Sequence, residues 1–97
     1  MSNESFCFTS PLGPLMDEYL NIKRHQNVGV RGILTVFCEL DQMPSVRRMQ
    51  KLAITQDIYL EWLKNVNICS ERTRYAKILI FRQFSQFMCH MRYASYI

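Results

Sequence analysis

Apolar residues recur along most of the chain at intervals of three and four, the spacing of one face of an α-helix. Four stretches carry this pattern, at residues 12–24, 30–42, 55–65 and 71–91. In the first stretch, apolar side chains follow the spacing i, i+3, i+4, i+7 and i+8 from Leu12 to Leu20. The pattern therefore predicts four helices joined by short links.

Residues at the ends of these stretches are typical helix caps and stops. Ser10 followed by Pro11 predicts an N-cap with a proline in the first turn, where its missing N–H costs little. Pro44 ends the second helix because its ring cannot continue one. Thr55 and Ser70 are expected to cap the third and fourth helices, since their hydroxyls accept from free N–H groups.

The other segments lack helical periodicity. Residues 1–10 are mostly polar, so we expect a flexible N-terminal arm. Residues 44–53 are polar and basic with scattered apolar positions, and we expect a loop with a helical turn. Residues 11–92 then form one domain, an all-α, compact four-helix bundle.

Composition agrees with this architecture and adds a charge asymmetry. The 97 residues are 48% hydrophobic and include only three glycines and three prolines, too few for the frequent turns of a β-sandwich or barrel. The net charge is +4. The charged residues in positions 1–20 are all acidic, whereas those in positions 65–97 are arginine and lysine except for Glu71. A second basic cluster contains Arg47, Arg48 and Lys51. Such asymmetry favours an anionic partner, and a solvated face is the alternative.

The four cysteines are widely spaced, at Cys7, Cys38, Cys69 and Cys89, without a Cys-x-x-Cys pair. The N-terminus lacks the basic and apolar regions of a signal peptide, and no apolar run approaches the roughly 20 residues of a membrane helix. We therefore expect reduced thiols in a soluble, cytoplasmic protein without a membrane partner.

The long fourth helix changes character along one line of its surface. Ile80, Phe84, Met88 and Met91 continue a line that begins with the polar Thr73 and Lys77. We expect its first two turns to project beyond the bundle, where Arg72, Thr73, Arg74 and Lys77 surround a helix N-terminus that favours a phosphate. This grouping is typical of a grip on a nucleic-acid backbone, and a solvated N-terminal turn is the alternative.

Other groupings carry no catalytic interpretation. Cys89 and His90 are adjacent on a helix and point in different directions, so they do not form a nucleophile–base pair. The Asp57 and Glu61 carboxylates favour a solvated face, and Trp62 is expected in the core. Arg82 is expected to be exposed or paired with one of those carboxylates. We expect neither a metal site nor a cofactor, and no small-molecule ligand.

The segment Ser70–Met88, SERTRYAKILIFRQFSQFM, resembles the last helix of the core-binding domain of tyrosine recombinases, the phage-type integrases. That helix reads S-x-R-T, then basic and apolar positions, then L-R-x-F-x-x-[YF]-L, with Phe81 here at the leucine position. Ser10–Arg24 resembles the family's first helix and Thr55–Lys64 its third. Residues 93–97, YASYI, resemble the start of the hinge to the catalytic domain. The departure lies at residues 27–38, where the family has a more basic link and helix.

The resemblance implies a SAM-like bundle that clamps one DNA half-site, with the second and fourth helices against the major groove. The catalytic residues would lie in a C-terminal domain, so the chain itself would not be an enzyme and neither Tyr93 nor Tyr96 would be the nucleophile. Its partners would be double-stranded DNA, that catalytic domain and other protomers of a synaptic tetramer. The residues expected to contact DNA are Arg72, Thr73, Arg74, Lys77, Arg31, Thr35, Arg47 and Arg48. A helical protein–protein interaction module is the alternative function.

Overall fold

The structure is a computed structural model that describes residues 8–27 and 29–95. In chain order its elements are α1 (Gly13–His25), α2 (Arg31–Gln42), α3 (Pro44–Arg47), β1 (Ala53–Ile54), α4 (Gln56–Val66), α5 (Glu71–His90) and β2 (Ala94–Ser95). The four predicted helices are confirmed, each end within one residue of its expected place, and α3 is the helical turn expected between residues 44 and 53.

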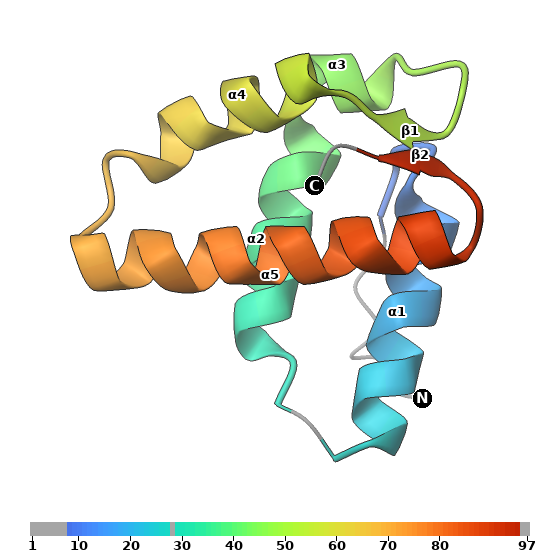
Figure 1. Ribbon diagram of the computed structural model, residues 1–97, viewed down its shortest axis with the longest axis horizontal. Coiled ribbons are helices and arrows are strands. Elements are labelled where there is room, and N and C mark those ends of the chain that lie inside the picture. Colours follow the sequence, from blue (N-terminus) through green and yellow to red (C-terminus); the bar gives the residue numbers. More distant parts are fainter. Residues whose placement is uncertain (1–7, 28, 96–97) are drawn as a thin grey trace.

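The helices pack in two crossed layers (Figure 1). α1 and α2 run antiparallel to each other, and α5 lies across both of them. α4 runs beside α5 and is connected to it by a short loop. The radius of gyration is 12.9 Å, close to the ~13 Å of a compact domain of 100 residues. The chain is therefore mostly helical and compact, as the sequence predicted.

Aromatic rings fill the crossing between the two layers. The ring of Phe37 on α2 lies 4.7 Å from that of Phe84 on α5, and Tyr19 of α1 lies within 6 Å of both. The fully buried Trp62 of α4 stacks on Phe81 of α5, with the ring centroids 4.6 Å apart. The prediction that Trp62 belongs to the core is confirmed. Such ring pairs add to the large apolar area that the side chains remove from water.

The residues just before α1 differ from the expected flexible arm. Phe8 packs against the core, and the buried Asp41 carboxylate on α2 accepts hydrogen bonds from the backbone N–H groups of Thr9 and Ser10 at 2.8–3.1 Å. Ser10 is also not the N-cap, which is Leu12. The predicted flexible arm is therefore wrong for Phe8–Ser10, because Asp41 and the core, both distant in sequence, hold these residues in place. Residues 1–7 of the predicted arm lie outside the described residues.

The two other predicted caps are confirmed, and α5 ends in a motif that the sequence did not indicate. The hydroxyl oxygens of Thr55 and Ser70 each accept from the N–H three residues on. At the end of α5, the N–H groups of Arg92 and Tyr93 donate to the carbonyls of Cys89 and Met88, which is a Schellman motif. Arg92 has φ 71°, a conformation that glycine usually supplies there.

The reversal after α5 brings its end back to the chain before α4. β1 and β2 pair in parallel, with Ala53 opposite Ala94 and Ile54 opposite Ser95. This pairing was not predicted, because each strand has only two residues and no alternating pattern. Met91, the last residue of the predicted apolar line, is 38% exposed and follows the end of α5 at His90. In the described part of the chain, no helix has the length and apolar character required to cross a membrane.

Candidate functional site: a groove between two crossed helices

A groove of about 390 Å³ lies where the N-terminal half of α2 crosses that of α5. We call it the α2–α5 groove and define it by its lining residues, which are Arg31, Gly32, Thr35, Arg72, Thr73, Ala76, Lys77 and Ile80. Five of the eight residues predicted to contact DNA are in this set. They come from two segments separated by nearly 40 residues of sequence, so the fold brings together what the sequence analysis identified separately.

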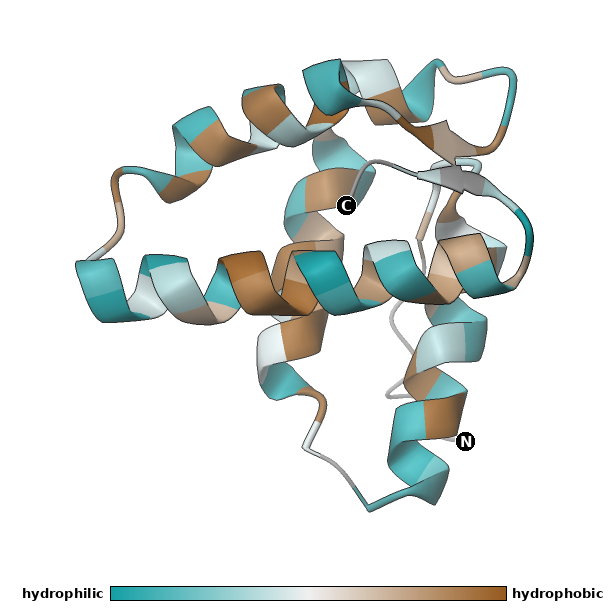
Figure 2. Cartoon of the chain, in the orientation of Figure 1, coloured by the Kyte–Doolittle hydropathy of each residue, from teal (hydrophilic) through white to brown (hydrophobic). Residues whose placement is uncertain are grey.

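Local structure determines how these side chains are presented. α5 begins at Glu71 because the Ser70 hydroxyl accepts from the N–H of Thr73, which places Arg72 and Thr73 in the exposed first turn. α2 begins at Arg31 without a side-chain cap. Its first N–H groups therefore keep the partial positive charge of a helix N-terminus. Figure 2 shows hydrophilic residues on the first turns of α5 and hydrophobic ones in its middle.

The floor of the groove is formed by apolar residues that let the helices approach closely. A Cβ atom added to Gly32 would lie 3.4 Å from Cδ1 of Ile80, at the short end of ordinary van der Waals contact. Ala76, one turn before Ile80 on α5, adds only a methyl group to the same floor. Gly32 and Ala76 leave the floor of the groove open because their side chains are small. The charged and hydroxyl-bearing side chains of the groove surround this floor.

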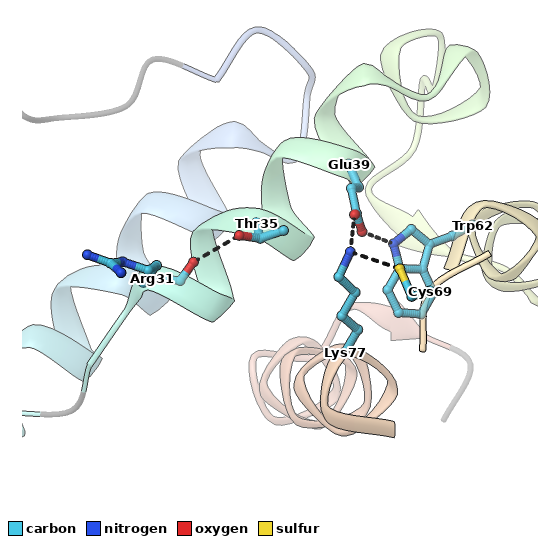
Figure 3. Close-up of polar contacts among 6 residues, drawn as sticks. All are labelled: Arg31, Thr35, Glu39, Trp62, Cys69 and Lys77. Carbon is cyan, nitrogen blue, oxygen red and sulfur yellow. Dashed lines mark hydrogen bonds and ion pairs between the residues drawn. The ribbon is translucent and has the colours of Figure 1, made fainter. Parts of the chain in front are cut away.

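Lys77 differs from the other cations of the groove. Its ammonium group forms an ion pair with Glu39 of α2, and the Lys77 side chain is only 15% exposed (Figure 3). The other oxygen of Glu39 accepts from Nε1 of Trp62 at 3.0 Å, and Sγ of Cys69 lies 3.8 Å from the Lys77 Nζ. The hydrogen bond from Lys77 to Glu39 raises the pKa of the lysine, so its ammonium remains charged.

The expectation that the first two turns of α5 project beyond the bundle is therefore correct only for the first. Arg72 and Thr73 are exposed, whereas Lys77 is held by Glu39 of α2 and lies beside Cys69 in the loop between α4 and α5. Glu39 was not among the predicted contacts, although its position in the sequence relates it to two residues that were. Arg31, Thr35 and Glu39 are spaced four apart, which places all three along one face of α2, as Figure 3 shows.

The remaining predicted contacts lie outside the groove. Arg74 is half-buried and does not line it. Arg47 is exposed on α3, where its guanidinium donates to Oγ1 of Thr9 at 2.9 Å, and Arg48 follows it at the end of α3. The fold therefore divides the predicted contacts between the groove and a separate basic pair on α3.

The residues without a catalytic interpretation lie as follows. Asp57 is exposed, as predicted for a solvated face, but Glu61 is half-buried and accepts from the Ser45 hydroxyl at 2.9 Å. Arg82 is exposed and forms no ion pair with a described residue. Cys89 is exposed.

Among the residues that the structure describes, no cysteine or tyrosine lines the α2–α5 groove. The described cysteines, Cys38, Cys69 and Cys89, are free thiols as expected, and Cys7 lies outside the described residues. Within residues 8–27 and 29–95, no three histidine, cysteine or acidic side chains gather in a way that would hold a metal ion. Tyr93 is half-buried, and Tyr96 lies outside the described residues.

Comparisons with known proteins were made at three levels. Neither a protein-family model, nor a curated protein, nor a solved structure matches this chain.

Proposed function

We propose that this protein is a DNA-binding module that contacts the phosphate backbone and base edges of a half-site through the α2–α5 groove. The observation that carries the proposal is the gathering of Arg31 and Thr35 from α2 with Arg72 and Thr73 from α5 around one groove. Two cations, two hydroxyl donors and a helix N-terminus are the groups that proteins use to contact DNA phosphates.

The charges of the groove support the same function. Arg31 and Arg72 are exposed, and neither forms an ion pair with a described residue. Their guanidinium groups are therefore free to neutralise phosphates and release counterions, which is the main source of affinity for DNA of any sequence. Thr35 and Thr73 are exposed beside them. The Thr35 hydroxyl donates to the Arg31 carbonyl at 3.1 Å and would have to rotate to donate to DNA, whereas that of Thr73 accepts from the Ser70 hydroxyl and can donate its own proton to a phosphate or a base edge.

The resemblance in sequence extends the proposal to a family. We propose that the bundle is the SAM-like core-binding domain of a tyrosine recombinase, and that a separate C-terminal domain performs DNA integration. α2 and α5 correspond to the second and fourth helices that the resemblance places against the major groove, and they cross each other at the groove (Figure 1). The module itself would supply affinity and position rather than catalysis.

Salt-dependent binding to a short random-sequence duplex tests the DNA-binding function. We expect Arg72→Gln and Arg31→Gln each to weaken binding and to reduce the slope of log affinity against log salt by about 0.9, the contribution of one phosphate contact. Fluorescence anisotropy at several salt concentrations measures both quantities. Arg82→Gln is the matched control, because it removes the same charge from an exposed position of α5 outside the groove. Equal behaviour of all three variants would contradict the assignment of the groove.

A protein–protein interaction module is the second candidate, and exposed apolar side chains favour it. Ile68 is 87% exposed before α5, while Tyr75 and Leu79 are 70% and 43% exposed one turn apart on that helix. Sedimentation at increasing protein concentration tests self-association. A dimer that is lost in Tyr75→Ser and retained in Gln83→Ser would support this candidate, and a monomer at all concentrations would count against self-association through this face.

A further inference from the structure

The Lys77–Glu39 ion pair connects α5 to α2 between two hollows of the surface. Lys77 lines the α2–α5 groove, whereas Glu39 lines a second hollow of about 300 Å³ with Cys38, Gln42 and Asn65. Both carboxylate oxygens of Glu39 are occupied, one by Lys77 and one by the indole N–H of Trp62. These two hydrogen bonds therefore fix the position of the carboxylate.

The pair is shielded enough to persist in salt. The side chains of Lys77 and Glu39 are 15% and 28% exposed, and charges that are partly buried are screened less by salt than charges in open solvent. A DNA phosphate that approached Lys77 would have to displace a carboxylate already in direct contact with it. Separating the pair would also leave Glu39 with its charge uncompensated beside Trp62.

We propose that Glu39 sets the electrostatic affinity of the groove for DNA, because it retains Lys77 as its own counter-ion and withholds that ammonium from DNA phosphates. This inference rests on the proposed DNA-binding function and deepens it. Arg31 and Arg72 then carry the electrostatic affinity of the groove, and the Lys77–Glu39 pair adds no net charge.

The consequence for recognition follows from the two parts of DNA affinity. Phosphate contacts strengthen binding to every sequence equally, whereas contacts to base edges discriminate between sequences. Removing one cation from the phosphate part lowers binding to random DNA and leaves the base contacts in place. Glu39 thereby lowers the affinity for every sequence by the same factor and leaves the discrimination between sequences to the base contacts.

Four proteins and a random-sequence duplex test the inference by anisotropy over a range of salt concentrations. They are the wild type, Glu39→Gln, Lys77→Gln and the double variant. We expect Glu39→Gln to bind more tightly, with a salt slope steeper by about 0.9 because Lys77 becomes available to a phosphate. Lys77→Gln should bind more weakly than the wild type, since Glu39 is left uncompensated. The double variant should match the wild type within about twofold and keep its slope, because the pair adds no net charge before or after the change.

Controls separate this local effect from folding and from net charge. Glu18→Gln makes the same chemical change on an exposed position of α1 outside the groove and should leave the salt slope unchanged. Trp62 is the only tryptophan, so its single indole N–H signal in a ¹H–¹⁵N spectrum reports whether each variant keeps the fold around residue 39. If Glu39→Gln fails to fold, the double variant decides alone, because it leaves neither charge without its partner.

The outcomes distinguish this inference from the function on which it rests. A double variant that binds more weakly than the wild type, with a slope reduced as in Arg72→Gln, would show that Lys77 leaves Glu39 for a phosphate and would overturn the inference alone. Absence of salt-dependent binding in both the wild type and Glu39→Gln would overturn the proposed function, and the inference with it.

Discussion

The two ends of α5 lie in the same helix but are stabilised by different interactions. The C-terminal half places Phe81, Phe84 and Met88 in a core where each is at most 1% exposed. The N-terminal half has one capping hydroxyl, exposed arginine and threonine, and the Lys77–Glu39 pair. Apolar burial determines the position of the C-terminal half, whereas polar contacts determine that of the N-terminal half.

This difference explains how a small domain can combine a stable core with an exposed binding surface. Apolar burial contributes most of the folding free energy, so it is concentrated where α1, α2 and α5 meet. The α2–α5 groove contributes less, and its arginines keep uncompensated charges that are available to a ligand. Changes in the first region should therefore affect stability, and changes in the second should affect binding.

The largest expected effect is in the aromatic core. Phe84→Ala should lower the free energy of unfolding by about 3–5 kcal/mol, because it leaves a cavity beside Tyr19 and Phe37. Urea denaturation followed by circular dichroism measures the change. Gln83→Ala, at the exposed neighbouring position, should stay within about 0.5 kcal/mol of the wild type. A loss below about 1 kcal/mol in Phe84→Ala, close to that of a surface substitution, would contradict the assignment of this half as the core.

A smaller effect is expected at Asp41, which fixes the chain before α1. Burial raises the pKa of this carboxyl, but hydrogen bonds from Ser10 and Thr9 outweigh it and hold the pKa below its ordinary value of 3.8. Asp41→Asn should cost about 1–3 kcal/mol at neutral pH.

The pH dependence of that cost follows from the sign of the shift. A depressed folded-state pKa stabilises the fold fully above the ordinary value and loses this contribution as the pH falls through the folded-state pKa. The difference between the wild type and Asp41→Asn should therefore shrink in acid, in denaturation curves recorded at several pH values. A difference that is constant with pH would count against this role, and Asp57→Asn serves as the exposed control.

The smallest effect is expected at the N-terminus of α5. Ser70→Ala removes the cap on the N–H of Thr73 and should cost about 1 kcal/mol. Amide hydrogen exchange should accelerate at Thr73 and Arg74 while it stays unchanged at Phe84, because the loss is confined to the first turn. Equal acceleration along the whole helix would show that the two halves of α5 are not separable in this way.

The parts of the fold that were predictable depend on local pattern. Helix periodicity, the hydroxyl caps at Thr55 and Ser70 and the buried Trp62 are properties of short stretches, and they were predicted correctly. The β1–β2 pairing was missed because its two strands lie about 40 residues apart and are too short to show a period. The anchor at Asp41 was missed for a similar reason, since its partners precede it by about 30 residues.

The residues of the candidate site also divide into those that the local sequence indicates and those that depend on distant contacts. Arg72 and Thr73 follow directly from the position of a helix N-terminus, so the sequence was sufficient to identify them. Arg31 and Thr35 were identified through the resemblance, and their place beside α5 became visible only in the fold. Lys77 was expected to be a free cation because its partner, Glu39, lies 38 residues away. Charge in a sequence thus indicates a binding face, whereas the availability of each charge depends on tertiary contacts.

The parallel pairing of β1 with β2 has a mechanical consequence. A force along the strand axis, applied to residues after Ser95, would slide β2 along β1, whereas a force across that axis would peel β2 away. Sliding loads the hydrogen bonds of the ladder together, and two residues in each strand give a small but sharp threshold of force. The ladder would yield before the aromatic core and would lengthen the connection after α5 while the helices remain folded.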